Sequence, residues 1–64
     1  MTLELFIEKW SIPTGGCLYP WSVWRDGQQV HYGQRHTTPE QAETEGLHYC
    51  QHVLGEPPAR VTRL

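Results

Sequence analysis

The chain has 64 residues, which predicts one small domain over residues 1–64 with a marginal hydrophobic core. Its formal net charge of −2 argues against a protein built mainly to hold phosphate backbones. No charge-poor run approaches the roughly 18 residues needed to span a membrane, and the amino terminus lacks a basic stretch followed by an apolar one. We therefore expect a cytoplasmic protein that makes no contact with membranes.

Three stretches in the first half of the chain have the pattern of β-strands. The predicted strands cover residues 2–10, 18–25 and 28–34. In the first of them Leu3, Leu5 and Ile7 alternate with polar or aromatic residues, as in a strand with one buried face. Asp26-Gly27 favours a type I′ turn, which needs a positive φ at both central positions. The second and third strands should therefore form a hairpin.

A two-residue turn sets the register of this hairpin. The opposite pairs are then Trp21 with Tyr32, Val23 with Val30, and Arg25 with Gln28. Residues directly opposite share a sheet face, so the inward set would be Trp21, Val23, Val30 and Tyr32. Because Pro20 cannot donate a ladder hydrogen bond, the strand should begin near Trp21 or bend there.

Residues 39–54 predict an amphipathic helix. Thr38 can serve as the N-cap, Pro39 suits the first helical position, and Gln41 completes a capping box. One arc of the helix carries Ala42, Gly46, Tyr49, Cys50, Val53 and Leu54. Gly55 is suited to a left-handed residue after the helix, and two prolines follow it closely, so the helix should end there.

These elements predict an α+β domain, a three-stranded antiparallel sheet with one C-terminal helix packed on one face (β-β-β-α). Gly46 has no side chain, so a large sheet residue such as Trp21 could approach the helix there. The tail covers residues 56–64, and its last part, residues 59–64, carries Val61 and Leu64 in an otherwise polar run. That pattern suits either a short edge strand or an end that becomes ordered against a partner.

The residues that could carry chemistry form no recognised motif. Cys17 and Cys50 lack metal or redox spacing, and without a secretion signal we expect no disulfide between them. His48 and His52 have the spacing of two zinc ligands, but a third ligand and a general base are missing. Neither a nucleophile–base motif nor a glycine-rich phosphate loop is present. The sequence therefore predicts no catalytic residue, no metal site and no cofactor.

The side of the sheet away from the helix is predicted to be unusually aromatic. It would carry Phe6, Trp10, Trp24 and His31. Large aromatics contribute much of the energy of protein interfaces. We therefore expect a non-catalytic interaction module that uses this face to form a homodimer or to bind a larger protein. In the alternative without a partner, one or two of these side chains fold under the tail or a loop.

Nucleic-acid binding is the alternative function. Three strands followed by a helix, with a glycine before the helix and a TPEQA start, resemble in outline the plant ethylene-response-factor DNA-binding domain and the phage integrase amino-terminal domain. The matching residues are Trp21, Val23, Gly33, Thr38, Glu40, Gln41, Ala42, Leu54 and Gly55. The resemblance implies a strand face in the DNA major groove. The residues that could take part in this way are Lys9, Trp24, Arg25 and Arg35.

On this alternative, the contacts to nucleic acid would come from the cations Lys9, Arg25, Arg35, Arg60 and Arg63. The strand region, however, offers three cations against the three anions Glu4, Glu8 and Asp26. Both families crowd their strands with basic residues. The likeness is therefore one of outline, and it does not place the chain in either family.

Overall fold

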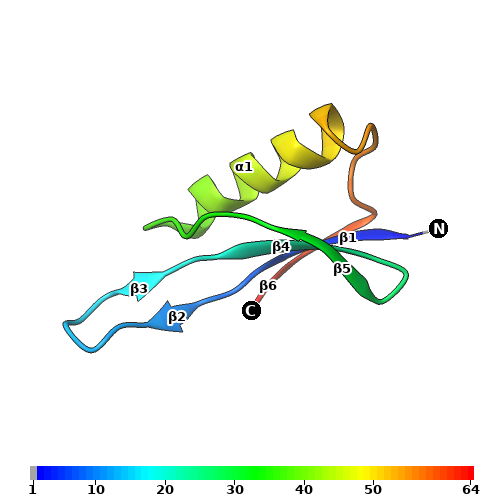
Figure 1. Ribbon diagram of the computed structural model, residues 1–64. Helices are drawn as coiled ribbons and strands as arrows, with labels where there is room; N and C mark the ends of the chain where they lie inside the picture. Colours follow the sequence, from blue (N-terminus) through cyan, green and yellow to red (C-terminus); the bar gives the residue numbers. More distant parts are fainter. Residues whose placement is uncertain (1) are drawn as a thin grey trace.

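The computed structural model describes residues 2–64 and shows one helix and six strands (Figure 1). The elements are β1 (Leu3–Ile7), β2 (Trp10–Ser11), β3 (Cys17–Leu18), β4 (Trp21–Arg25), β5 (Gln28–Tyr32), α1 (Pro39–His52) and β6 (Arg60–Arg63). The predicted α+β class is confirmed. Within the described residues, no helix combines the length and apolar character that crossing a membrane requires.

The main sheet has four strands in the order β5-β4-β1-β6, one more than predicted. Strand β4 is antiparallel to both β1 and β5, whereas β6 is parallel to β1. The tail joins the sheet at both ends of β6, where Ala59 N donates to Leu3 O at 2.7 Å and Leu64 N donates to Ile7 O at 2.8 Å. Of the two predicted outcomes for the tail, the edge strand is therefore the one observed.

A two-stranded arm extends the hairpin of β1 and β4 beyond the main sheet (Figure 1). Strands β2 and β3 pair in it, so the predicted strands over residues 2–10 and 18–25 are each interrupted. The break on one side lies at Pro20, which has no N–H for the ladder. Its carbonyl still accepts from Glu8 N at 2.8 Å, and the arm stays attached to the sheet.

The register of β4 with β5 differs from the prediction after two residue pairs. Arg25 lies opposite Gln28, as predicted, but a β-bulge then shifts the pairing so that Val23 lies opposite His31. Val30 is the extra residue in β5. Because side chains alternate along a strand, one extra residue moves every later side chain to the other face. The inward positions predicted for Val30 and Tyr32 are therefore wrong.

The hydrophobic core lies between α1 and the inner faces of β1 and β4. Its buried residues are Leu3, Leu5, Ile7, Trp21, Val23, Ala42 and Cys50. Two glycines allow close packing. A Cβ added to Gly46 would lie 2.6 Å from Leu5 Cδ1, and one added to Gly33 would overlap the Trp21 ring. The sheet residue that approaches Gly46 is thus Leu5, not Trp21.

Both ends of α1 show the expected capping chemistry. Thr38 Oγ1 accepts from Gln41 N at 3.2 Å, so the predicted N-cap is confirmed. The helix ends at His52, two residues before the predicted end. Gly55 has a φ of +79°, and the next N–H, that of Glu56, donates to Cys50 O at 3.1 Å. This pattern satisfies a terminal carbonyl of the helix and turns the chain back toward the sheet.

The variant Gly46→Ala tests the packing of helix on sheet. In an exposed helix this change adds about 1 kcal/mol of stability. Here the methyl group would press on Leu5, which is fully buried, and overpacking costs about 1–3 kcal/mol. We expect a net loss in the free energy of unfolding, measured by urea denaturation. Gln51→Ala, at an exposed helix position, is the control and should stay within about 0.5 kcal/mol of wild type. A more stable Gly46→Ala would contradict this packing.

Candidate interaction surface

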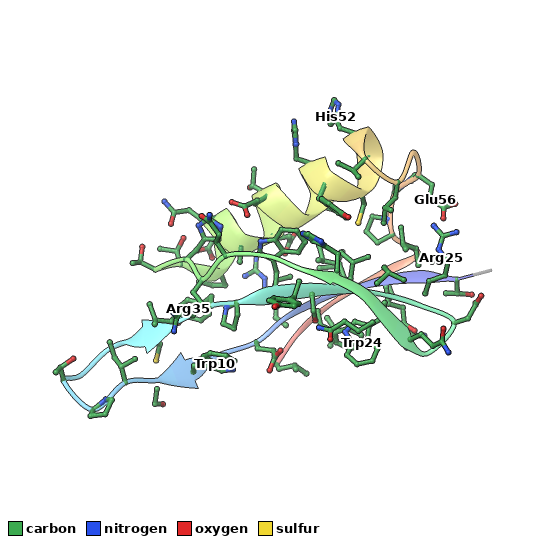
Figure 2. All side chains as sticks on the ribbon, in the orientation of Figure 1. Trp10, Trp24, Arg25, Arg35, His52 and Glu56 are labelled. Carbon is green, nitrogen blue, oxygen red and sulfur yellow. The ribbon has the colours of Figure 1, made fainter. Side chains whose placement is uncertain are left out.

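The face of the sheet away from α1, here called the outer face, centres on an aromatic pair. Phe6 in β1 and Trp24 in β4 meet edge to face, with ring centroids 6.1 Å apart and planes at 81°. Trp24 Nε1 donates to Ser22 Oγ at 2.9 Å, so the polar atom of the indole is satisfied within the face. Figure 2 shows Trp24 on the side of the sheet opposite the helix. The partly exposed remainder of both rings is apolar.

Trp10 lies away from this pair, on the arm (Figure 2). Its side chain is 47% exposed, and its Nε1 donates to Glu8 Oε1 over a long 3.4 Å. A groove of about 460 Å³ lies at the base of the arm, here called the arm groove. It is lined by Trp10, Pro20, Tyr32, Gly33, Gln34 and Arg35. The predicted aromatic surface therefore has two separate parts, the central pair and this groove.

His31 does not lie on the outer face, so its predicted placement is wrong. The β-bulge turns it toward the helix, where its ring stacks on Tyr49 with centroids 4.0 Å apart and lies 5.4 Å from Trp21. Tyr32 takes the outward position and is 73% exposed. Sequence reasoning missed Tyr32 because nothing in the alternation of β5 marks Val30 as an extra residue.

The ion pairs of the arginines lie on the helix side of the sheet. On the helix side Arg25 lies 2.8 Å from Glu56. Arg63 lies 3.0 Å from Glu43 and 3.4 Å from Glu40. Two of the five cations predicted for nucleic-acid contact are therefore in ion pairs. Within residues 2–64 the other three, Lys9, Arg35 and Arg60, make no ion pair.

Both signs of charge are present on the outer face. Glu4 in β1 lies opposite Arg60 in β6, and residues opposite each other in a sheet share a face. Neither of them has an ion pair within the part of the chain that the structure describes. The outer face thus combines an apolar centre with an unpaired anion and an unpaired cation beside it.

Glu45 of α1 links the helix to Trp21 in β4 and to His36, in the segment after β5. Its Oε1 accepts from Trp21 Nε1 at 3.1 Å, and its Oε2 lies 2.7 Å from His36 Nε2. The second contact has ion-pair distance without the alignment of a hydrogen bond. The backbone of His36 also exchanges two hydrogen bonds with Tyr19, at 2.8 and 3.2 Å. These contacts hold together elements that are distant in sequence, and we assign them a structural role.

The histidine pair on α1 lies apart from other metal ligands. His48 and His52 stack with ring centroids 4.1 Å apart, in keeping with their spacing of four residues. Among residues 2–64 the structure contains no group of three or more His, Cys, Asp or Glu side chains placed to hold a metal ion. Two imidazoles alone do not complete a tetrahedral zinc site.

The two cysteines are free and have different surroundings. Cys17, in the arm, is partly exposed, whereas Cys50 is fully buried in the core. Burial raises the pKa of the Cys50 thiol above its ordinary value of 9.0, and the charge of Glu56 raises it further. A buried neutral thiol is a poor nucleophile, because the thiolate is the reactive form. Cys50 therefore acts as a small core residue.

Comparison with protein-family models, with curated proteins and with solved structures finds no match for this chain. The outline resemblance to the ethylene-response-factor and integrase domains thus gains no support from these comparisons. The parallel edge strand β6 also lies outside the three-strands-and-helix order on which that resemblance rests.

Thiol alkylation tests the contrast between the cysteines. In the native protein iodoacetamide should label Cys17, and the variant Cys17→Ser should stay unlabelled until it is unfolded.

The raised pKa of Cys50 also makes the stability of the protein depend on pH. Above pH 9.0 the unfolded chain releases this proton while the folded chain keeps it, so stability falls as pH rises, by at most about 1.4 kcal/mol per pH unit. In the variant Cys50→Ala this loss of stability with rising pH should be absent. Labelling of native Cys17→Ser below pH 9.0 would contradict the burial of Cys50.

Proposed function

We propose that this chain is a small non-catalytic interaction module that associates with a second copy of itself through the outer face of its sheet. The observation that carries the proposal is the Phe6–Trp24 pair, which lies at the centre of the sheet face that no helix of residues 2–64 covers (Figure 1). Two central strands supply these rings, so the sheet positions them rigidly.

Burial of this face is favourable because its centre is apolar. The helix shields only one side of the sheet, and the Trp24 indole already has a hydrogen-bond partner in Ser22. A partner can therefore cover the ring without leaving a buried donor unsatisfied. Two sheets that pack face to face bury such alternating side chains in a layer about 10 Å thick. The outer face has the composition for that kind of packing.

The charges favour a second copy as the partner. Glu4 and Arg60 lie side by side on the face, and neither has an ion pair within residues 2–64. A two-fold axis brings the same patch of two copies together, so each anion can meet the cation of the other copy. A strongly acidic or basic partner would match only one of the two charges. The face is thus complementary to itself.

The size of the face predicts weak association. Four strands of about five residues offer roughly 300 Å² of projected sheet, from spacings of about 4.8 Å between strands and 3.3 Å along them. Permanent dimers bury considerably more than this, and interfaces at the low end of the size range are transient. We therefore expect a dimer that dissociates on dilution.

Sedimentation equilibrium at a series of concentrations tests this proposal. Wild type should shift from monomer to dimer, and Trp24→Ala should remain monomeric because it removes the largest apolar ring of the face. Val53→Ser is the matched control, since Val53 is 63% exposed but follows the helix on the other side of the sheet, and it should dimerise as wild type does. Wild type that stays monomeric up to about 1 mM, or Trp24→Ala that still dimerises, would refute the proposal.

Reversing the charge of Glu4 or of Arg60 tests whether a second copy covers the outer face. These substitutions leave the hydrophobic core unchanged. Glu4→Arg makes the patch wholly basic, and Arg60→Glu makes it wholly acidic. Each variant alone should dimerise at least about tenfold more weakly than wild type, because like charges would meet across the axis. An equimolar mixture of the two should form heterodimers. If the mixture associates no better than its components, these charges do not face each other between copies.

The nucleic-acid alternative predicts a different salt dependence. Lys9, Arg35 and Arg60 are its remaining contacts, because Arg25 and Arg63 are in ion pairs. Binding of an oligonucleotide through phosphates would weaken steeply as salt concentration rises, whereas dimerisation should weaken less, because burial of Phe6 and Trp24 does not depend on ionic contacts and only the contacts of Glu4 with Arg60 do. Steep salt dependence of a complex with DNA or RNA would favour the alternative.

A further inference from the structure

We propose that the arm groove binds an extended, proline-containing peptide segment that carries an acidic residue. This binding site is separate from the Phe6–Trp24 pair, and its use does not depend on self-association. The groove lies where the arm leaves the main sheet, with Trp10 from the arm and Tyr32 from β5 among its lining residues.

The aromatic side chains of the groove are available to a ligand. Trp10 is 47% exposed and Tyr32 is 73% exposed, so both rings present apolar surface to the solvent. Pro20, which is buried, also lines the groove, and Gly33 contributes no side chain to obstruct it. Two open aromatic rings beside an apolar proline form a surface into which a compact apolar ring can insert.

Proline is the residue whose shape and chemistry fit this surface best. Its ring is compact and fixes the backbone φ, and proline-rich segments hold the extended polyproline II conformation before they bind, which lowers the entropy cost of binding. Grooves lined by aromatic side chains recognise such segments. The backbone carbonyls of a polyproline II segment have no internal partner and need donors from the protein.

The polar residues around the groove can supply those donors. The Tyr32 hydroxyl and the Gln34 amide make no hydrogen bond within residues 2–64. The Trp10 indole has only its long contact to Glu8. All three residues can therefore donate to carbonyl groups of a ligand at little cost to the fold.

The positive charge of Arg35 favours proline-containing segments that also carry an acidic residue. Arg35 lines the groove, is exposed, and makes no ion pair in the described part of the chain. Glu8 lies on the Trp10 side, where it accepts from the indole. The lining of the groove thus includes one cation, Arg35, whereas the anion Glu8 lies next to the Trp10 indole and outside the lining. An acidic ligand residue should lie against Arg35, and this preference sets the direction of the bound segment.

The open edge of β5 is a weaker candidate for peptide binding. An added strand needs a regular row of unpaired N–H and C=O groups, and the β-bulge at Val30 interrupts this row. The arm groove needs no such row, because a polyproline II ligand contributes rings and carbonyl groups. The observations therefore favour the groove.

Nuclear magnetic resonance titration of the full chain tests the proposal with an acetylated and amidated peptide of sequence Ala-Pro-Pro-Glu-Pro-Pro-Ala. We expect a saturable shift of the Trp10 indole N–H resonance, with the buried Trp21 indole little changed. Two control peptides replace Glu by Lys or every Pro by Gly, and both should bind at least about tenfold more weakly.

Variants of the protein separate this proposal from the proposed self-association. Trp10→Ala should abolish peptide binding and still form dimers, whereas Trp24→Ala should lose the dimer and still bind the peptide. Arg35→Glu should reverse the preference, so that the Lys peptide binds better than the Glu peptide. Backbone amide spectra verify that each variant is folded.

Three results would overturn the inference. The first is no saturable shift with up to about 5 mM peptide, which corresponds to an interaction weaker than about 3 kcal/mol. The second is peptide binding that survives both Trp10→Ala and Arg35→Glu, since the ligand would then lie elsewhere. The third is an oligothymidylate that shifts the Trp10 resonance at lower concentration than the peptide and loses binding steeply with salt, which would assign the groove to single-stranded nucleic acid.

Discussion

The close contact between Gly46 of α1 and Leu5 of β1 is the interaction on which the rest of the structure depends. Leu5 is fully buried, and its strand lies between β4 and β6 in the sheet. Because Gly46 has no side chain, the helix backbone can approach the sheet directly over this residue. A core as small as this one must pack tightly, since few residues supply its hydrophobic stabilisation. The position of α1 then decides which sheet face is covered.

Within residues 2–64, one helix covers one face of the four-stranded sheet, and no helix or strand lies over the opposite face. The consequences are visible in how the polar groups are satisfied. On the covered side Arg63 reaches two glutamates of the helix and Trp21 donates to Glu45, so distant elements are linked. On the outer face Trp24 finds its partner within its own strand, at Ser22. The polar atom of Trp24 is therefore satisfied within the outer face, and the apolar centre of that face, Phe6 and Trp24, is partly exposed.

The β-bulge at Val30 separates two surfaces that a regular hairpin would not produce. Without it, Tyr32 would face the helix and His31 would face outward. With it, His31 stacks on Tyr49 and completes the aromatic packing around Trp21, while Tyr32 reaches the groove at the base of the arm. The extra residue Val30 thus places His31 and Tyr32 on the sheet faces opposite to those they would have in a regular hairpin. Bulges commonly redirect side chains near functional sites in this way.

The sequence by itself determined the features that depend on neighbouring residues. Thr38 and Pro39 mark the start of the helix, Asp26 and Gly27 take the positive φ values of the hairpin turn, and the alternation in β1 places Leu5 inward and Phe6 outward. Each follows from local sterics or from a period of two. For the same reason, Phe6 and Trp24 could be assigned to the outer face before the structure was known.

Only the tertiary structure decided the features that depend on contacts between distant segments. These are the bulge at Val30, the parallel pairing of β6 with β1, and the groove that joins Trp10 to Tyr32. The tail pattern is compatible with a strand or with a free end, and pairing is favourable because the edge of β1 is open when the helix brings the chain back to it. Register and edge pairing are set by the whole sheet, so no local pattern specifies them.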